Sequence, residues 1–77
     1  MTKSELRQSK EYADCINKIK GYPQGFIFTL NYTQMRTGQR NAMRIILHDA
    51  INEKLIESIS FGVALSGEIT DETFKRL

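Results

Sequence analysis

The chain has 77 residues, of which 40% are hydrophobic and 26% are charged, and a formal net charge of +2 at pH 7. This length and composition predict a single globular domain, residues 1–77, with a limited hydrophobic core. One cysteine, Cys15, excludes an internal disulfide, and one cysteine with one histidine offers no credible tetrahedral zinc site. The sequence has neither a long apolar stretch nor a secretory N-terminus, so we expect a cytoplasmic protein without a membrane partner, a metal or a cofactor.

The charges are unevenly distributed along the chain. Residues 1–44 hold eight lysines and arginines against three acidic residues, a balance of +5, whereas residues 45–77 hold three against six, a balance of −3. This asymmetry predicts one basic face and one acidic face, although the small net charge by itself gives no support for nucleic-acid binding.

Residues 2–20 are predicted to form a first helix. Thr2 and Glu5 have the spacing of a capping box, in which each side chain accepts a hydrogen bond from the other residue's backbone N–H. A thin apolar stripe follows at helical spacing, formed by Leu6, Tyr12, Ala13, Ile16 and Ile19. The helix is expected to stop at Gly21, which can adopt the left-handed conformation, and Pro23 is a second stop signal.

A loop over residues 21–25 precedes a strand over residues 26–30, where aromatic and β-branched side chains follow one another. The next six residues, 31–36, allow two interpretations. In one, the strand continues through Tyr32. In the other, which we prefer, a short helix buries Leu30 and Met35 and ends before the next helix.

The strongest helix signal covers residues 37–55. Its apolar side chains recur at i, i+3, i+4, i+7 and i+8, which is the spacing of one buried face, and Leu55 extends that face: Met43, Ile46, Leu47, Ala50, Ile51 and Leu55. Thr37 is predicted to cap this helix, because its hydroxyl can accept from the free N–H groups of the first turn.

The opposite flank of this helix carries a basic stripe with a four-residue spacing, made of Arg36, Arg40, Arg44 and His48. At about 100° per residue, Arg44 and His48 point away from the apolar face. Arginines at this end of a helix oppose the helix dipole, which favours acids there, by roughly a few tenths of a kcal/mol. The stripe is interpreted either as a recognition surface for phosphates and base edges or as an ordinary solvated helix face.

The remaining residues contain a further strand and a turn. Residues 56–65 alternate in the manner of a strand, and residues 66–68 form a turn. Residues 73–77 allow two structures: a returning strand that completes a hairpin, or a helical turn that Thr70 would cap.

Together these elements predict an α+β fold with an N-terminal helix, a short strand, a long central amphipathic helix and a C-terminal β-hairpin. Strand 26–30 is expected to pair with strand 56–65 in a small antiparallel sheet packed on the helices. This order looks like a winged helix. On that interpretation residues 30–35 form the first helix of a helix-turn-helix, residues 36–38 its turn, and residues 39–55 the recognition helix.

Three features form a wider pattern over roughly residues 25–77: the strand Gly25-Phe26-Ile27-Phe28-Thr29-Leu30, the basic helix from Arg40 to Ile51, and the tail Thr73-Phe74-Lys75-Arg76. The pattern resembles small winged-helix-like proteins of phages and mobile genetic elements, including uncharacterised staphylococcal ones. Roles assigned to such proteins lie in nucleic-acid transactions or in the manipulation of host or partner proteins. The resemblance therefore implies one of these two functions.

The predicted wing departs from a DNA-reading wing in its charge. Such a wing usually carries lysine or arginine at its tip, whereas here the tip ends in Glu68, and Asp71 and Glu72 follow. These acids would repel phosphate, so wing contacts to DNA are not expected.

No catalytic motif is present in the sequence. His48 is the only histidine, so a histidine-dependent relay would depend on it alone, and Cys15 fits a small apolar filler better than a reactive thiol. The five glycines are scattered and form no phosphate-binding loop. We therefore expect a protein that is not an enzyme.

The first functional prediction is a nucleic-acid-binding protein, either a transcription regulator or a replication accessory, with DNA favoured over RNA. Its predicted contact residues are Arg36, Arg40, Asn41, Arg44, His48, Lys18 and Lys20. The alternative is a protein-interaction module or inhibitor that acts on a host or partner protein through the acidic residues Glu57, Glu68, Asp71 and Glu72. A homodimer is compatible with both functions, because it would bury the apolar residues Phe26, Phe28, Phe61 and Val63.

Overall fold

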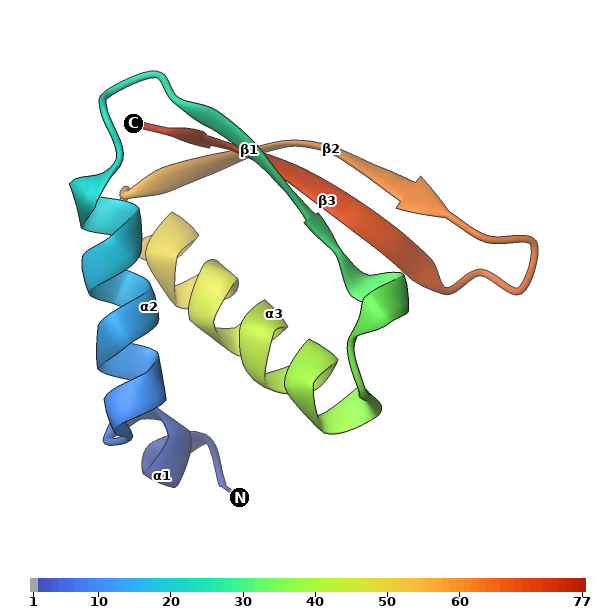
Figure 1. Ribbon diagram of the computed structural model, residues 1–77, viewed down its shortest axis with the longest axis horizontal. Helices are drawn as coiled ribbons and strands as arrows, with labels where there is room; N and C mark the ends of the chain where they lie inside the picture. The colour runs from blue at the N-terminus through green and yellow to red at the C-terminus, as the bar shows by residue number, and fades with distance from the viewer. Residues whose placement is uncertain (1) are drawn as a thin grey trace.

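The chain folds into a small α+β domain (Figure 1). The structure is a computed structural model and describes residues 2–77. The helices are α1 (Lys3–Arg7), α2 (Lys10–Gly21) and α3 (Thr37–Asn52), with one 3-10 turn, η1 (Tyr32–Gln34). The strands are β1 (Ile27–Asn31), β2 (Ile56–Val63) and β3 (Ile69–Arg76), and they form one antiparallel sheet. The predicted α+β class is confirmed.

The prediction of a single helix over residues 2–20 is wrong, because Ser9 interrupts it. The Ser9 hydroxyl accepts a hydrogen bond from the Tyr12 N–H at 3.1 Å and donates one to the Leu6 carbonyl at 2.7 Å. A serine at this position satisfies a free N–H of a new first turn, so α2 begins where the apolar spacing alone suggests continuity.

The two predicted ends of this N-terminal region are confirmed. Thr2 and Glu5 form the capping box of α1, and α2 ends at Gly21. Gly21 does not adopt the left-handed conformation, however. Within residues 2–77 the glycines with positive φ are Gly25, which precedes β1, and Gly67 in the hairpin turn.

Helix α3 begins at the predicted residue but is capped by its neighbour. Arg36, rather than Thr37, occupies the N-cap, and its backbone N–H donates to the Gln39 side-chain oxygen at 3.1 Å. The predicted N-cap at Thr37 is therefore wrong: Thr37 is the first residue of α3, and the side-chain contact at this terminus is made by Gln39 to the N–H of the N-cap residue.

The C-terminal end of α3 lies before Leu55, because Lys54 takes the left-handed conformation with φ of 60°. The Leu55 N–H then donates to the Ala50 carbonyl at 2.8 Å, and the Lys54 N–H donates to the Ile51 carbonyl at 2.9 Å. This bond pair is a Schellman motif, with lysine at the position that usually holds glycine. The predicted extension of the helix to residue 55 is wrong for this reason.

The ambiguous residues 31–36 resolve into one turn rather than a helix of normal length. The Asn31 side chain accepts from the Thr33 N–H at 3.0 Å and starts η1. The strand ends at Asn31, Tyr32 is buried in η1, and Met35 packs half-buried against the core. The segment before α3 is therefore much shorter than the first helix of a helix-turn-helix would be.

The strand order in the sheet is β1-β3-β2, so β3 is the central strand. The expected pairing of strand 26–30 with strand 56–65 is wrong, because β3 lies between them and pairs with both. Of the two interpretations of the C-terminus, the returning strand is correct and the helical turn at Thr70 is wrong. A register shift between Ser58 and Ser60 interrupts the regular alternation of β2.

The helices cover one face of the sheet, and the core lies between the two layers. Of the predicted face of α3, Ile46, Leu47 and Ala50 are buried there, whereas Met43, Ile51 and Leu55 are only partly buried. The other buried residues of the core are Leu6, Ile16, Ile19, Tyr32, Ile56 and Phe74. On the open face the hydroxyls of Thr29 and Thr73 lie 2.9 Å apart. The turn end of the β2–β3 hairpin projects beyond the helices (Figure 1), so Phe61, Val63 and Leu65 are exposed.

Arg76 fastens the end of the central strand to the helical layer. Its guanidinium donates to the carbonyls of Ile19 at 3.1 Å, Leu55 at 3.0 Å and Leu77 at 2.7 Å. Ile19 lies in the last turn of α2, and Leu55 lies in the link between α3 and β2. One side chain therefore holds the ends of three elements together, and it adds a second donor to the carbonyls of Ile19 and Leu55, which also accept from the N–H groups of Tyr22 and Leu77.

Replacing Arg76 with methionine is expected to lower the free energy of unfolding by about 2–3 kcal/mol, because charge-assisted hydrogen bonds are lost while the aliphatic volume is kept. Urea denaturation measures this loss. Lys75→Met is the matched control, since Lys75 is exposed on the same strand. An equal effect of both substitutions would contradict the assigned role of Arg76.

Candidate functional site

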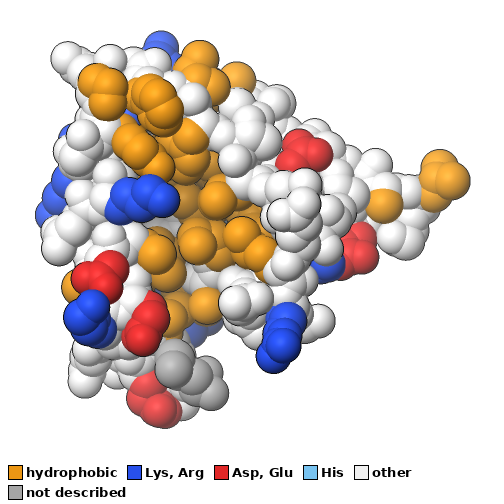
Figure 2. All heavy atoms as spheres, viewed as in Figure 1, with side chains coloured by type: hydrophobic (Ala, Val, Ile, Leu, Met, Phe, Trp, Pro, Cys, Tyr) orange, Lys and Arg blue, Asp and Glu red, His pale blue; other side chains and the backbone are white. Residues whose placement is uncertain are grey.

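Helix α3 borders two different surfaces, and the first is an apolar groove of about 690 Å³. Leu6 and Cys15 line it from the N-terminal helices, and Ala42, Met43 and Ile45 line it from α3, with other apolar and polar residues between them. Figure 2 shows apolar side chains gathered in a hollow between the N-terminal helices and the segment that leads into α3. The rim is polar and mixed in charge, with Lys3, Glu11, Gln39 and Asn41.

Two residues of the groove floor have little or no side chain. Gly38 and Ala42 both belong to α3 and lie one turn apart. A Cβ atom added at Gly38 would meet no atom within 4 Å, so this end of the groove is open. The floor therefore allows another backbone to approach α3 closely.

Cys15 lies half-buried at the wall of this groove. Burial raises the pKa of its thiol, so the reactive thiolate is disfavoured at neutral pH. The side chain packs against the core, which supports the predicted role as an apolar filler.

The second surface of α3 carries the predicted basic stripe, and two of its arginines are already paired. The Arg40 Nε donates to the Met35 carbonyl at 3.0 Å, and its Nη1 forms an ion pair with Glu68 of the hairpin turn. Glu68 was predicted as a possible partner-binding acid, and it instead contacts a residue of its own chain. The Arg40 side chain is 26% exposed and that of Glu68 is 59% exposed.

Arg44 is held more firmly, by a buried acid on the central strand. Its Nη1 lies 2.5 Å from the Glu72 Oε1, and the Tyr32 hydroxyl donates to the Glu72 Oε2 at 3.3 Å. Glu72 is only 9% exposed. Burial, reinforced by the Glu72 carboxylate, raises the pKa of Tyr32. Glu72 is therefore a structural residue that is unavailable to an outside partner.

A pocket of about 220 Å³ lies where these ion pairs meet the start of α3. Its walls come from three elements: Tyr32 from η1, Thr37, Arg40, Asn41 and Arg44 from α3, and Glu68 and Ile69 from the hairpin. It is the point at which the basic stripe and the hairpin acids face each other.

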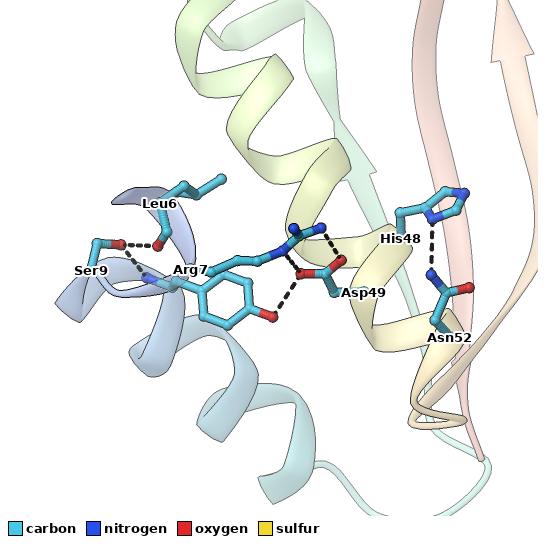
Figure 3. A network of polar contacts seen from close by, with 7 residues as sticks. Leu6, Arg7, Ser9, His48, Asp49 and Asn52 are labelled. Atoms are coloured by element: carbon cyan, nitrogen blue, oxygen red, sulfur yellow. Dashed lines mark hydrogen bonds and ion pairs between the residues drawn. The ribbon is translucent and has the colours of Figure 1, made fainter. Parts of the chain in front are cut away.

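The other residues predicted to contact nucleic acid do not gather at one place. Arg36 and Asn41 are exposed near the start of α3, whereas Lys18 and Lys20 are exposed near the end of α2. Figure 1 shows that these two helix ends lie on opposite sides of the molecule. His48 is exposed, as predicted, with its Nδ1 3.4 Å from the Asn52 Nδ2 (Figure 3).

The remaining acids of the alternative prediction also lie apart. Glu57 is exposed on β2, opposite Lys75 of β3. Asp71 is half-buried and accepts a hydrogen bond from the Thr70 hydroxyl at 3.1 Å. The four acids therefore form no continuous acidic surface.

A three-residue polar cluster around Asp49 was not predicted from the sequence (Figure 3). The Arg7 Nε and Nη2 donate to the two Asp49 carboxylate oxygens, both at 2.9 Å, and the Tyr12 hydroxyl donates to Oδ2 at 2.8 Å. The cluster joins α1, α2 and α3. Arg7 and Tyr12 lie 42 and 37 residues from Asp49 in the chain, so no local spacing in the sequence indicates the cluster.

The cluster shifts the titration of both its acidic groups. Hydrogen bonds from Arg7 hold the pKa of Asp49 below its usual range, against the opposite effect of burial. Burial raises the pKa of Tyr12 to about 12, with a further contribution from Asp49. Asp49 is therefore ionised at neutral pH while Tyr12 stays protonated and donates to it.

Within residues 2–77, no three histidine, cysteine, aspartate or glutamate residues are grouped so as to hold a metal ion. No helix of this part of the chain has the length and apolar character needed to cross a membrane. A comparison with protein-family models, with curated proteins and with solved structures finds no match for this chain.

Replacing Asp49 with asparagine is expected to destabilise the fold at pH 7 and to matter less in acid. The folded-state pKa of Asp49 is depressed, so its stabilising contribution is present above the unfolded value of about 4 and disappears as the pH falls through the folded value. Urea denaturation of the wild type and of Asp49→Asn gives the free energy of unfolding at pH 7 and at about pH 3. The difference between the two proteins is expected to be smaller at the lower pH. Asp14→Asn, which alters only an exposed pair with Lys10, is the control and is expected to change little.

Proposed function

We propose that this domain is a protein-interaction module whose apolar groove receives an amphipathic helix of a partner protein. The observation that carries the proposal is the open groove itself. It is apolar at its floor and polar at its rim, which is the usual arrangement of a binding site. The groove is bounded by the N-terminal helices on one side and by α3 on the other.

The shape of the groove favours a helix as its occupant. Gly38, Ala42 and Ile45 line its floor at the i, i+4, i+7 spacing of one helix face. Such a row presents ridges and grooves that another helix can match, and the two small residues allow close approach. A partner would contribute apolar side chains at the same spacing.

The groove has a structural origin in the short segment before α3. We propose a winged-helix-like arrangement, supported by the order α2, β1, η1, α3 and hairpin, in which η1 stands where the first helix of the turn motif was predicted. Because η1 is a single turn, it covers little of the flank of α3. Met35 and Met43 remain only partly buried.

Gly38→Glu is expected to reduce binding of a helical peptide at least about tenfold while leaving the fold intact, because the charged side chain enters the apolar floor. The position has open space, and a glutamate in the first turn of α3 suits the helix dipole. The probe is a helical peptide selected against this domain from a displayed library with randomised apolar positions. Its affinity is measured by calorimetry.

Gly21→Glu is the matched control, since Gly21 also has open space, is helical and lies outside the groove. Equal loss of affinity in both variants would refute the proposal, as would a library that yields no binder dependent on Gly38. Light scattering during the same titrations shows whether a second copy of this chain fills the groove instead.

The second candidate is nucleic-acid binding by a regulator or replication accessory, with DNA favoured over RNA. It is supported by the exposed cations Arg36, Lys18 and Lys20, none of which forms an ion pair within residues 2–77. It is weakened by the pairing of Arg40 and Arg44 with acids of the hairpin. This makes it less well supported than the groove.

Under this second candidate, Arg36→Gln is expected to weaken binding to a labelled DNA duplex and to lower the slope of log K against log salt by about 0.9, the value for one phosphate contact. Fluorescence anisotropy at several salt concentrations measures both quantities, with a labelled single strand in parallel. Lys75→Gln removes the same charge from an exposed strand position away from α3 and is the control. An unchanged slope for Arg36→Gln would exclude Arg36 from the contact.

A further inference from the structure

We propose that the 220 Å³ pocket beside Arg40 and Arg44 is a phosphate-binding site, and that the Glu68 carboxylate occupies it in the unliganded protein. The pocket is separate from the apolar floor of the groove, so the inference does not depend on the partner helix. Residues of α3, η1 and the hairpin together line this pocket.

Arg40 is held in position for an anion by its backbone contact. Its Nε donates to the Met35 carbonyl, which fixes the guanidinium plane and leaves the Nη groups to face the hairpin. The Glu68 carboxylate pairs with Nη1 of this group, and a guanidinium has five N–H donors. A phosphate has more acceptor oxygens than a carboxylate and can take several of these donors at once.

The pocket supplies further polar groups of the right kind. Thr37, with a hydroxyl, and Asn41, with a side-chain amide, line it, and Arg44 lines it as a second cation. Hydroxyl, amide and guanidinium groups are all hydrogen-bond donors to phosphate oxygens.

The charges explain why Glu68 and phosphate compete. Arg40 and Arg44 bring two positive charges, and Glu68 and Glu72 bring two negative charges, so the pocket is neutral as it stands. Removal of the Glu68 carboxylate leaves one net positive charge beside Arg40. A phosphate entering the pocket would restore the balance.

Of the two acids, only Glu68 can be displaced readily. Glu72 is buried and also accepts a hydrogen bond from Tyr32, whereas the Glu68 side chain is 59% exposed at the end of a turn. An exposed ion pair contributes little to stability, so its exchange for a stronger ligand is easy. Glu68 is thus the occupant that a phosphate replaces.

The phosphate could belong to a nucleic-acid backbone or be a free ion, and two titrations distinguish these sources. In one, inorganic phosphate is added and the backbone and arginine side-chain NMR signals of Thr37, Arg40 and Asn41 are followed. In the other, a labelled DNA duplex is titrated and anisotropy is measured. Both use the wild-type chain, Glu68→Gln, Arg40→Gln and Glu57→Gln.

Glu68→Gln is expected to tighten binding of at least one probe about fivefold, since an exposed ion pair of up to about 1 kcal/mol no longer competes. Arg40→Gln is expected to abolish the NMR response with an unchanged fold, which its amide spectrum reports. Glu57→Gln removes the same charge from the same hairpin away from the pocket and is expected to change affinity less than twofold.

A response to phosphate alone identifies the free ion as the source, and a response to DNA alone identifies the backbone; both support the site. Equal tightening by Glu68→Gln and Glu57→Gln overturns it, because net charge then explains the effect. Absence of any pocket response to either probe in Glu68→Gln also overturns it. Neither result touches the groove, which is tested through Gly38 with a peptide.

Discussion

The ion pair between Arg44 and Glu72 is the contact on which the relation of helix to sheet depends. Glu72 lies on the central strand and is nearly buried, so its charge is stable there only with partners. Arg44 and Tyr32 supply them, and they come from α3 and η1. The pair therefore links α3 to the central strand. Loss of Arg44 would leave a buried carboxylate without a countercharge, which destabilises far more than loss of an exposed ion pair.

This contact belongs to a wider pattern of pairing between the two halves of the chain. The N-terminal half is basic and the C-terminal half is acidic, and that asymmetry predicts separate basic and acidic faces. The fold instead joins the two halves through three ion pairs: Arg7–Asp49, Arg40–Glu68 and Arg44–Glu72. These three pairs neutralise part of the positive charge that residues 1–44 carry. This is why an apolar surface, and not the basic stripe, is the better supported binding site.

Local signals in the sequence predict several local features of the fold, although the helix break at Ser9 and the N-cap at Arg36 were missed. The buried face of α3, the capping box at Thr2 and the turn at residues 66–68 all depend on neighbouring residues, and the sequence predicts them. Three features depended on distant or unusual contacts and were missed. The central position of β3 follows from pairing on both of its edges, the end of α3 from a left-handed lysine, and the neutralised stripe from acids 28 residues away in the case of Arg44.

The two surfaces of α3 share one cause, the shortness of η1. A single 3-10 turn between β1 and α3 leaves the Met43 flank without a covering helix, which opens the groove. The same turn places Tyr32 beneath Glu72 and the Met35 carbonyl beside Arg40, which sets the walls of the small pocket. A longer helix at this point would cover the groove and would shift both Tyr32 and the Met35 carbonyl. Met35 and Asn41 are common to the two surfaces, because Met35 lines the groove while its carbonyl accepts from Arg40, and Asn41 lines both the groove and the pocket.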